Sequence, residues 1–260
     1  MPFKILSVDD NIYNPTDTIS ALPALLDKEG YEVAVTADGN AAYDLVFEVK
    51  PDVIVLDDGL QYWQLHRDLD IVVLSARRPF GSGFVLPMGD LREPISGLRR
   101  AGLVLLTGAA SIPEDRLASV RAAVSRLAPG VPVFAANHEP VSIRNVETGV
   151  EQDVTWMADR KVFAFCGIGQ PESFLNSLHS LRPSLVGNTT FPDHYRLSDA
   201  DITAIIDGAN VCGAEAIVTT EKDCARLGGR HIPHLYTLVI ELKIEDNLRF
   251  AQYIANRINP

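Results

Sequence analysis

The chain has 260 residues, of which 47% are hydrophobic and 22% are charged, and its formal net charge is −11 at pH 7. This length can bury a substantial core in one large domain or in two unequal ones. The acidic balance argues against a general nucleic-acid binder, and no apolar run approaches the roughly 20 residues of a membrane span. Three scattered cysteines and the lack of signal-peptide features favour a reducing, cytoplasmic compartment.

Short apolar runs alternate with amphipathic stretches along most of the chain. The runs are rich in β-branched residues and predict strands buried on both faces. Strands that alternate with helices indicate an α/β fold, with a mostly parallel sheet and helices on both of its faces. In chain order we predict strands at 4–8, 31–35, 52–56, 70–74, 102–108 and 131–136, and helices at 17–29, 40–49 and 113–127.

Residues 138–160 differ from the preceding part, because apolar and polar residues alternate around the turn at 147–149. This pattern predicts a hairpin, which we interpret as a hinge. We therefore predict a parallel α/β core domain over 1–137 and a smaller α/β domain over 161–260. The predicted elements of the smaller domain are apolar segments at 162–169, 185–191, 216–223 and 237–242, with helices at 171–181, from Ser198, and at about 246–258.

Polar residues mark several expected helix starts. Ser111 with Glu114 resembles a capping box, and Ser198 lies at the expected capping distance ahead of Asp201. Thr220 can cap a helix that has acidic residues in its first turn. Lys222 in that turn could instead reach an anion, and the sequence leaves both readings open.

Charge is unevenly distributed along the chain. Residues 1–58 hold twelve carboxylates against three lysines, whereas residues 77–100 hold five arginines against two carboxylates. A basic segment in an acidic chain indicates a local anionic ligand, although a solvated surface loop explains it equally well.

Asp57 and Asp58 directly follow the predicted strand at 52–56. Adjacent carboxylates in this position can hold Mg²⁺ for phosphoryl transfer. A phospho-acceptor aspartate and a helix cap are the alternatives. Because ligands of parallel sheets bind at the carboxyl ends of the strands, we expect one shared rim for the polar residues that follow strands, namely Asp9, Asp10, Asp57, Asp58, Ser75 and Thr107.

The connection between the predicted strands at 70–74 and 102–108 is long and rich in glycine, proline and arginine. Connections of this length are more often functional than structural. Gly81 and Gly83 permit a close approach of the backbone to a ligand. The planar guanidinium groups of the arginines suit phosphate oxygens.

Four motifs in chain order resemble the tetraacyldisaccharide 4'-kinase family of lipid A biosynthesis. They are DDGLQY with the arginine-rich loop that follows it, VFAFCGIGQPESFLNSL, FPDHYRLSDADI and VTTEKDCARL, and the resemblance covers about residues 50–260. It implies transfer of the γ-phosphoryl group of ATP to the 4'-hydroxyl of an acylated glucosamine disaccharide phosphate. It further implies Mg²⁺ as cofactor, a P-loop-NTPase-like core, and work at the cytoplasmic face of the inner membrane.

The resemblance also implies roles for particular residues. His194 matches the family's active-site histidine, and a neutral imidazole could assist deprotonation of a sugar hydroxyl. Without the family, a histidine in Asp-His-Tyr is more simply a turn residue. The predicted catalytic residues are His194, Asp193 and Asp57, the metal ligands Asp57, Asp58, Asp9 and Asp10, and the phosphate-binding residues Gln61, Arg77, Arg78, Gly81, Gly83, Arg92 and Lys222.

Residues 1–57 instead resemble a response-regulator receiver domain, through KILSVDDN, DKEGYEVAVTADGNAAYDLV and KPDVIVLD. In that pattern Asp9, Asp10 and Asp57 bind Mg²⁺, and Asp57 accepts phosphate. The segment DDNIYNPTDTIS has neither the glycines nor the lysine of a phosphate loop. The alternatives to a working kinase are therefore a phospho-acceptor signalling module and an inactive paralogue that still binds the sugar phosphate.

Overall fold

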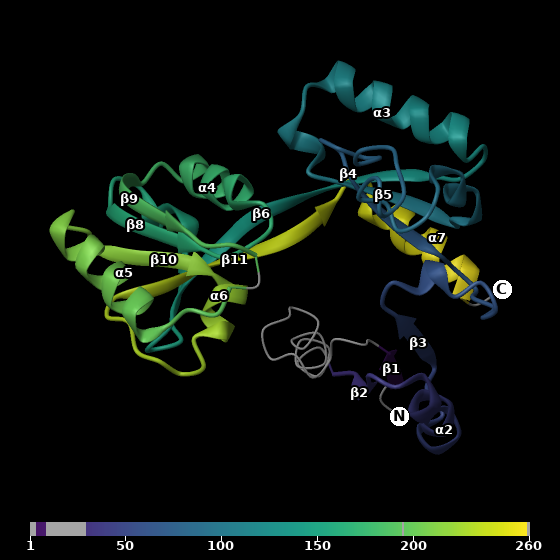
Figure 1. The fold of residues 1–260 in the computed structure, drawn as a ribbon, viewed down its shortest axis with the longest axis horizontal. Helices are drawn as coiled ribbons and strands as arrows, with labels where there is room; N and C mark the ends of the chain where they lie inside the picture. The colour runs from purple at the N-terminus through teal and green to yellow at the C-terminus, as the bar shows by residue number, and fades with distance from the viewer. Residues whose placement is uncertain (1–3, 9–29, 194, 259–260) are drawn as a thin grey trace. The chain divides into compact units, whose positions relative to one another are not determined.

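The structure is a computed structural model that describes residues 4–8, 30–193 and 195–258 (Figure 1). The chain divides into two compact units, which we call unit 1 (1–57 and 140–240) and unit 2 (58–139 and 241–260), and each is described by itself. This division differs from the predicted domains. The order of elements along the chain does not reveal that its last segment returns to pack with residues 58–139.

A three-stranded parallel sheet in unit 1 has the order β2-β1-β3. The helix α2 (Gly39–Val49) connects the second strand to the third. The ladder continues past the end of β3, because the backbone N–H of Asp57 donates to the carbonyl of Val8 over 3.0 Å. The strands are β1 (Lys4–Val8), β2 (Glu32–Thr36) and β3 (Val53–Leu56).

The rest of unit 1 contains parallel strands in the order β11-β10-β8-β9. Alternate residues of β8 pack on opposite sides, as the side-chain period of a strand requires. Cys166 and the residues of β8 on the same side of the strand pack with Phe174 and Leu178 of α4. Phe165, on the other side, packs with Ile205 of α5. The elements are β8 (Lys161–Cys166), α4 (Pro171–Ser180), β9 (Ser184–Thr190), α5 (Asp199–Val211), β10 (Ala216–Thr220), α6 (Glu221–Arg226) and β11 (Leu235–Ile244).

Unit 2 contains parallel strands in the order β4-β5-β6. Figure 1 shows α3 and α7 on opposite faces of these strands. The sequence explains this arrangement, because Val104 and Leu106 of β5 pack with α3, and Leu103 and Leu105 pack with α7. The elements are β4 (Ile71–Ser75), β5 (Leu103–Thr107), α3 (Glu114–Leu127), β6 (Val133–Asn145) and α7 (Asn247–Ile258).

The predicted hairpin around the turn at 147–149 is confirmed. The strand β7 (Glu151–Asp153) pairs antiparallel with the end of β6, where Ser142 lies opposite Asp153. The side chain of Asn145 closes the turn by accepting from the backbone N–H groups of Glu147 and Thr148. The role of this segment as a hinge stays a prediction.

The sequence predicted the fold class, and the structure confirms an α/β fold with mostly parallel strands. The single shared rim is wrong, because β3 and β4 belong to different sheets. Full burial of these strands is also wrong, since Ile54 is 46% exposed and Val73 is 58% exposed. Strand pairing is a tertiary property that a run of β-branched residues does not encode.

Two of the three predicted caps are present. Ser198 and Asp201 form a reciprocal capping box, and Thr220 accepts from the backbone N–H of Asp223. The box predicted for α3 is wrong, because Pro113 occupies the N-cap and Ser111 donates to the carbonyl of Gly108 over 2.6 Å. The helix predicted at 17–29 lies outside the described residues. Among the residues that the structure describes, no helix has both the length and the apolar character needed to cross a bilayer.

The buried thiol of Cys166 predicts that the stability of unit 1 decreases at alkaline pH. Burial, followed by the charge of Asp223, raises the pKa of its thiol from 9.0 to about 11. Folding favours the neutral thiol, so its stabilising contribution is complete below pH 9 and is lost as the pH rises toward 11. We expect Cys166→Ala to reduce the loss of unfolding free energy between pH 9 and 11 by about 2 kcal/mol. Denaturant titrations at each pH measure the free energy of unfolding.

The exposed Cys212 provides the control for this prediction. Cys212→Ala should retain the pH dependence of the parent chain, because its thiol is not buried. If the unfolding free energies of Cys166→Ala and the parent chain fell equally between pH 9 and 11, the attribution of this pH dependence to Cys166 would be wrong.

Candidate functional site

The carboxyl ends of β8, β9 and β10 lie at one edge of unit 1 because these strands are parallel and adjacent. Cys166 lies opposite Thr190 at the ends of β8 and β9. The backbone N–H of Phe191 then donates to the carbonyl of Cys166 over 2.8 Å. The motifs GIG, FPDHY and EKD, which follow these three strands, therefore start from the same edge.

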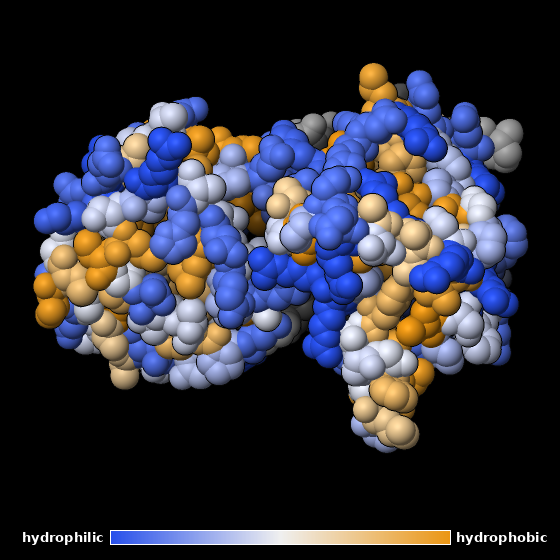
Figure 2. Space-filling model, turned by 90° about the horizontal axis from the view of Figure 1, so that it is seen from above, coloured by the Kyte–Doolittle hydropathy of each residue, from blue (hydrophilic) through white to orange (hydrophobic). Residues whose placement is uncertain are grey.

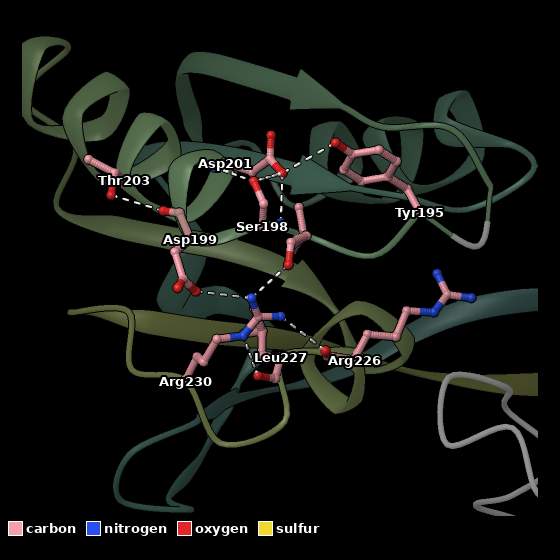
Figure 3. Close-up of polar contacts among 9 residues, drawn as sticks. Tyr195, Ser198, Asp199, Asp201, Thr203, Arg226, Leu227 and Arg230 are labelled. Carbon is pink, nitrogen blue, oxygen red and sulfur yellow. Dashed lines mark hydrogen bonds and ion pairs between the residues drawn. The ribbon is translucent and has the colours of Figure 1, made fainter.

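The segment around the predicted histidine is a turn held at both ends. The backbone N–H of Tyr195 donates to the carbonyl of Pro192 over 3.2 Å, and its ring stacks on Phe191 with centroids 5.3 Å apart. The hydroxyl of Tyr195 contacts Asp201 over 3.3 Å (Figure 3). Predicted catalytic residue His194 lies outside the described residues.

Asp201 links this turn to the start of α5. Hydrogen bonds from the hydroxyl and the backbone N–H of Ser198 hold the pKa of its carboxyl below the usual range. The resulting negative charge raises the pKa of the Tyr195 hydroxyl. Tyr195 therefore remains a neutral phenol at physiological pH and acts here as a hydrogen-bonding anchor for the turn.

Asp193 lies against the glycine turn that follows β8. A β-carbon added to Gly169 would be 2.9 Å from a carboxylate oxygen of Asp193. Glycine at this position therefore lets the carboxylate pass close to the main chain. The structure brings the predicted catalytic residue Asp193 to the GIG motif.

A buried ion pair lies beneath this turn. The side chains of Arg226 and Asp223 are at most 4% exposed, and they are 3.1 Å apart. Asp223 accepts from the backbone N–H of Gly167 over 3.0 Å, and Arg226 donates to the carbonyl of the same residue over 2.7 Å. The sequence predicts phosphate binding by Lys222 of the EKD motif, which is exposed. It does not single out Asp223 and Arg226, whose side chains are buried.

The other two residues of the EKD motif, Glu221 and Lys222, lie in the first turn of α6. Glu221 forms an ion pair with Arg144 over 3.1 Å, and Lys222 is exposed. The spacing of Thr220, Asp223 and Arg226 at three-residue intervals places them on one helical face, and this was the available signal. Their burial could not be read from the sequence.

The predicted phosphate-binding loop in unit 2 contacts Asp58. Asp58 has a left-handed backbone with φ of 49° at the start of the short 3-10 helix η2 (Gly59–Gln61). Its carboxylate forms an ion pair with Arg92, and both side chains remain more than half exposed. The structure thus joins a predicted metal ligand to a predicted phosphate ligand. Gln61 in η2 is exposed, as is Asp57.

Asp90 organises the first part of the loop. It accepts from the backbone N–H and the hydroxyl of Ser82 over 2.7 and 2.8 Å, and it pairs with Arg78 over 3.2 Å. The hydrogen bond from the Ser82 backbone is the main cause of the low pKa of Asp90. Gly81 has φ of +51°, and a β-carbon there would overlap the Asp90 carboxylate. The requirement for glycine is therefore internal to the loop.

The other arginines of the loop also have partners. Arg77 donates to the hydroxyl of Ser111 over 3.2 Å. Arg100 pairs with Glu93, and its guanidinium lies 5.1 Å from the ring centroid of Trp63. Arg77, Arg78 and Arg92 remain exposed. An anionic ligand could therefore exchange with their surface partners at small cost, because exposed ion pairs contribute only about 0–1 kcal/mol.

No group of three or more His, Cys, Asp or Glu side chains placed to hold a metal occurs in 4–8, 30–193 and 195–258. Asp9 and Asp10 lie outside these ranges. Mg²⁺ in phosphoryl-transfer sites commonly takes one or two carboxylates and completes its shell with phosphate and water. Asp57 and Asp58 together satisfy that smaller requirement in donor chemistry.

Comparison with known proteins decides the family. The family model described as tetraacyldisaccharide-1-P 4'-kinase matches residues 15–259. The chain belongs to this family. The match begins well before residue 50, so it also includes most of the segment that resembles a receiver domain.

Curated relatives within the family carry the name tetraacyldisaccharide 4'-kinase. The relative from Syntrophobacter fumaroxidans is 38% identical over 207 residues, which are 79% of this chain and 54% of the relative. The relative from Syntrophus aciditrophicus is 36% identical over 216 residues, and the match covers 78% of this chain and 56% of the relative. The chain thus spans about half the length of these members of the kinase family.

A solved structure from the kinase family has the same fold. It is the "apo" form of LpxK from Aquifex aeolicus in complex with ATP, with a TM-score of 0.63 and 22% sequence identity. The alignment covers 99% of this chain and 89% of that chain. The path of the chain through both units is therefore a fold that this family adopts.

Asp90 provides a test of the loop architecture. We expect Asp90→Ala to raise the hydrogen-exchange rate of the Ser82 amide about tenfold, since a lost hydrogen bond to a charged acceptor costs about 1.5 kcal/mol. Exchange measured by NMR at neutral pH reports this amide directly. Asp68→Ala, which removes an exposed carboxylate ahead of β4, is the control and should leave it unchanged. An unaltered Ser82 rate in Asp90→Ala would refute the loop architecture.

Proposed function

We propose that the chain is the part of a lipid A kinase that transfers the γ-phosphoryl group of ATP to the 4'-hydroxyl of an acylated glucosamine disaccharide 1-phosphate. The family match over residues 15–259 carries this proposal. It includes Asp57, Asp58, the arginine loop and the segment from Asp193 to Tyr195. The name of the Aquifex structure, which includes ATP, supports ATP as the phosphoryl donor.

The reaction replaces the bond between the γ-phosphorus and the β,γ-bridging oxygen of ATP by a bond to the sugar oxygen. ADP leaves with the bridging oxygen, and the hydroxyl proton must go to a base. We assign that base to the pair Asp193 and His194, since a neutral imidazole near pH 7 accepts a proton readily. Asp57 and Asp58 would hold Mg²⁺, which neutralises charge on the phosphates when bound.

The arginine loop is assigned to the anionic groups of the ligands. Phosphoryl transfer depends mainly on positioning and on neutralising the charge of the phosphate oxygens. The chain contains no glycine-rich segment that ends in Lys and Ser or Thr. We therefore assign phosphate binding to Arg77, Arg78 and Arg92, with Lys222 as a further cation.

The proposal is tested with purified chain, Mg²⁺, labelled ATP and a tetraacyldisaccharide 1-phosphate in detergent micelles. We expect labelled product, and a thermal shift on titration with ATP and Mg²⁺. Arg77→Ala and Arg78→Ala should each weaken binding of the disaccharide phosphate about tenfold, the effect of losing one charged hydrogen bond. Isothermal titration calorimetry measures this binding.

Arg126→Ala is the matched control, because Arg126 is an exposed arginine of the same unit on α3. It should bind the disaccharide phosphate like the parent chain. No labelled product and no response to ATP and Mg²⁺ would refute the kinase proposal. A stable acyl phosphate on Asp57 after incubation with a small phosphodonor would favour the receiver-like alternative.

An exposed apolar segment supports a lipid-linked substrate. Phe84, Leu86 and Met88 are 58%, 63% and 78% exposed at the tip of the arginine loop. Backbone hydrogen bonds from Leu86 to Leu91 and from Leu91 to Phe84 hold the tip together. Figure 2 shows hydrophobic side chains exposed among hydrophilic and intermediate ones on one face of the molecule. We propose that this tip contacts the acyl region of a lipid surface.

Binding to vesicles tests the lipid contact without kinase activity. We expect the chain to cosediment with vesicles that contain anionic phospholipid, because arginines flank the apolar tip. The variant Leu86→Ser with Met88→Ser should lose about a hundredfold or more in vesicle affinity, since each of the two buried apolar side chains contributes about 1.5 kcal/mol or more. Val211→Ser, at a site that is 88% exposed in unit 1, is the control. Equal binding by all three proteins would refute the contact.

A further inference from the structure

We infer that Asp223 and Arg226 are positioning residues, which hold Gly167 by both of its backbone polar groups and thereby fix the place of the Asp193 carboxylate. This inference deepens the proposed function, because it assumes that Asp193 belongs to the reaction site. It concerns two residues with buried side chains, to which the proposed function assigns no role in binding phosphate, metal or nucleotide.

The contact with Gly167 is two-sided. Asp223 accepts from the N–H of Gly167, and Arg226 donates to its carbonyl. The hydroxyl of Thr220 also donates to Asp223 over 2.6 Å, so the carboxylate is itself held in one orientation. A residue whose N–H and carbonyl are both bound has little freedom to shift, because any displacement breaks a charged hydrogen bond in a dry environment.

Stability alone does not require such a pair. Burying two charges is costly, and apolar residues of similar volume are often equally stable or more so. What apolar residues cannot supply is hydrogen bonding to a buried N–H and a buried carbonyl. The specific product of this pair is therefore a fixed position of the Gly167 backbone.

Gly167 transmits this position to the Asp193 segment. A β-carbon on Gly167 would lie 3.3 Å from Asp223 and 3.4 Å from the carbonyl of Pro192, so the 191–192 main chain packs directly against it. Two residues later Gly169 lies against the Asp193 carboxylate. The turn thus lies close to the Asp193 segment at two points, and at Gly169 a β-carbon would be closer to the Asp193 carboxylate than side-chain contacts normally come.

The neighbouring Arg230 provides a matched control. It also donates to backbone carbonyls, namely those of Leu197, Leu227 and Arg226 over 2.6, 2.8 and 3.5 Å (Figure 3). None of these hydrogen bonds goes to Gly167. Arg230→Lys and Arg226→Lys are therefore the same chemical change at neighbouring sites. Only the second should move the glycine turn.

The variant Gly169→Ala changes the position of the Asp193 carboxylate without a substitution in the buried pair. The added methyl group would displace the Asp193 carboxylate, a flexible side-chain end, and it leaves the buried pair intact. This variant therefore keeps the inference testable if Arg226→Lys fails to fold. Thermal denaturation followed by circular dichroism shows whether each variant is folded.

The first measurement is the backbone NMR spectrum of the labelled full chain, which needs no activity. We expect the Gly169 and Asp193 amide resonances to move in Arg226→Lys, and the Asp193 amide resonance to move in Gly169→Ala. Neither resonance should move in Arg230→Lys. The second is steady-state phosphoryl transfer. Arg226→Lys and Gly169→Ala should lower kcat about tenfold or more with KM changed less than about twofold, since a misplaced reacting group affects the chemical step.

The outcomes separate this inference from the proposed function. Transfer by the parent chain with unchanged kcat in both Arg226→Lys and Gly169→Ala would overturn the inference and leave the kinase proposal standing. Absence of transfer by the parent chain would refute the kinase proposal, and the NMR spectra would then decide the positioning role. Asp193 resonances that stay in place in both variants would overturn it.

Discussion

The parallel pairing of β8 with β9 and with β10 is the constraint on which the candidate site in unit 1 depends. Parallel strands end at one edge, so segments far apart in the chain start there together. Glycines at 167 and 169 let these segments approach within van der Waals contact. The Asp223–Arg226 pair then satisfies the backbone groups that this close approach buries.

Unit 2 uses charge in a different way. Its arginine loop lies at the surface, where Asp58 and Asp90 pair with exposed guanidinium groups. Surface pairs of this kind stabilise a fold only slightly, and solvent or a ligand can replace either partner. The buried pair of unit 1 is suited to holding a backbone, whereas the exposed pairs of unit 2 are suited to exchanging one anion for another.

Membership of the kinase family places these features in one enzyme class, and the chain spans about half the length of the curated relatives. The family match includes the segment from residue 15 onward, so it covers most of the receiver-like segment but not KILSVDDN. Both patterns place an aspartate after a central parallel strand. In the three-stranded sheet, however, Asp57 follows β3, which is an edge strand in the order β2-β1-β3.

The sequence by itself determined the fold class, most element positions and the caps at Ser198 and Thr220. These features follow from short-range periodicity and capping chemistry, which local sequence contains. Its motifs also indicated the kinase family. The tertiary structure alone decided that β3 and β4 belong to different sheets and that Asp223 and Arg226 are buried. Strand pairing and burial depend on contacts between distant segments, and no local pattern records which segments meet.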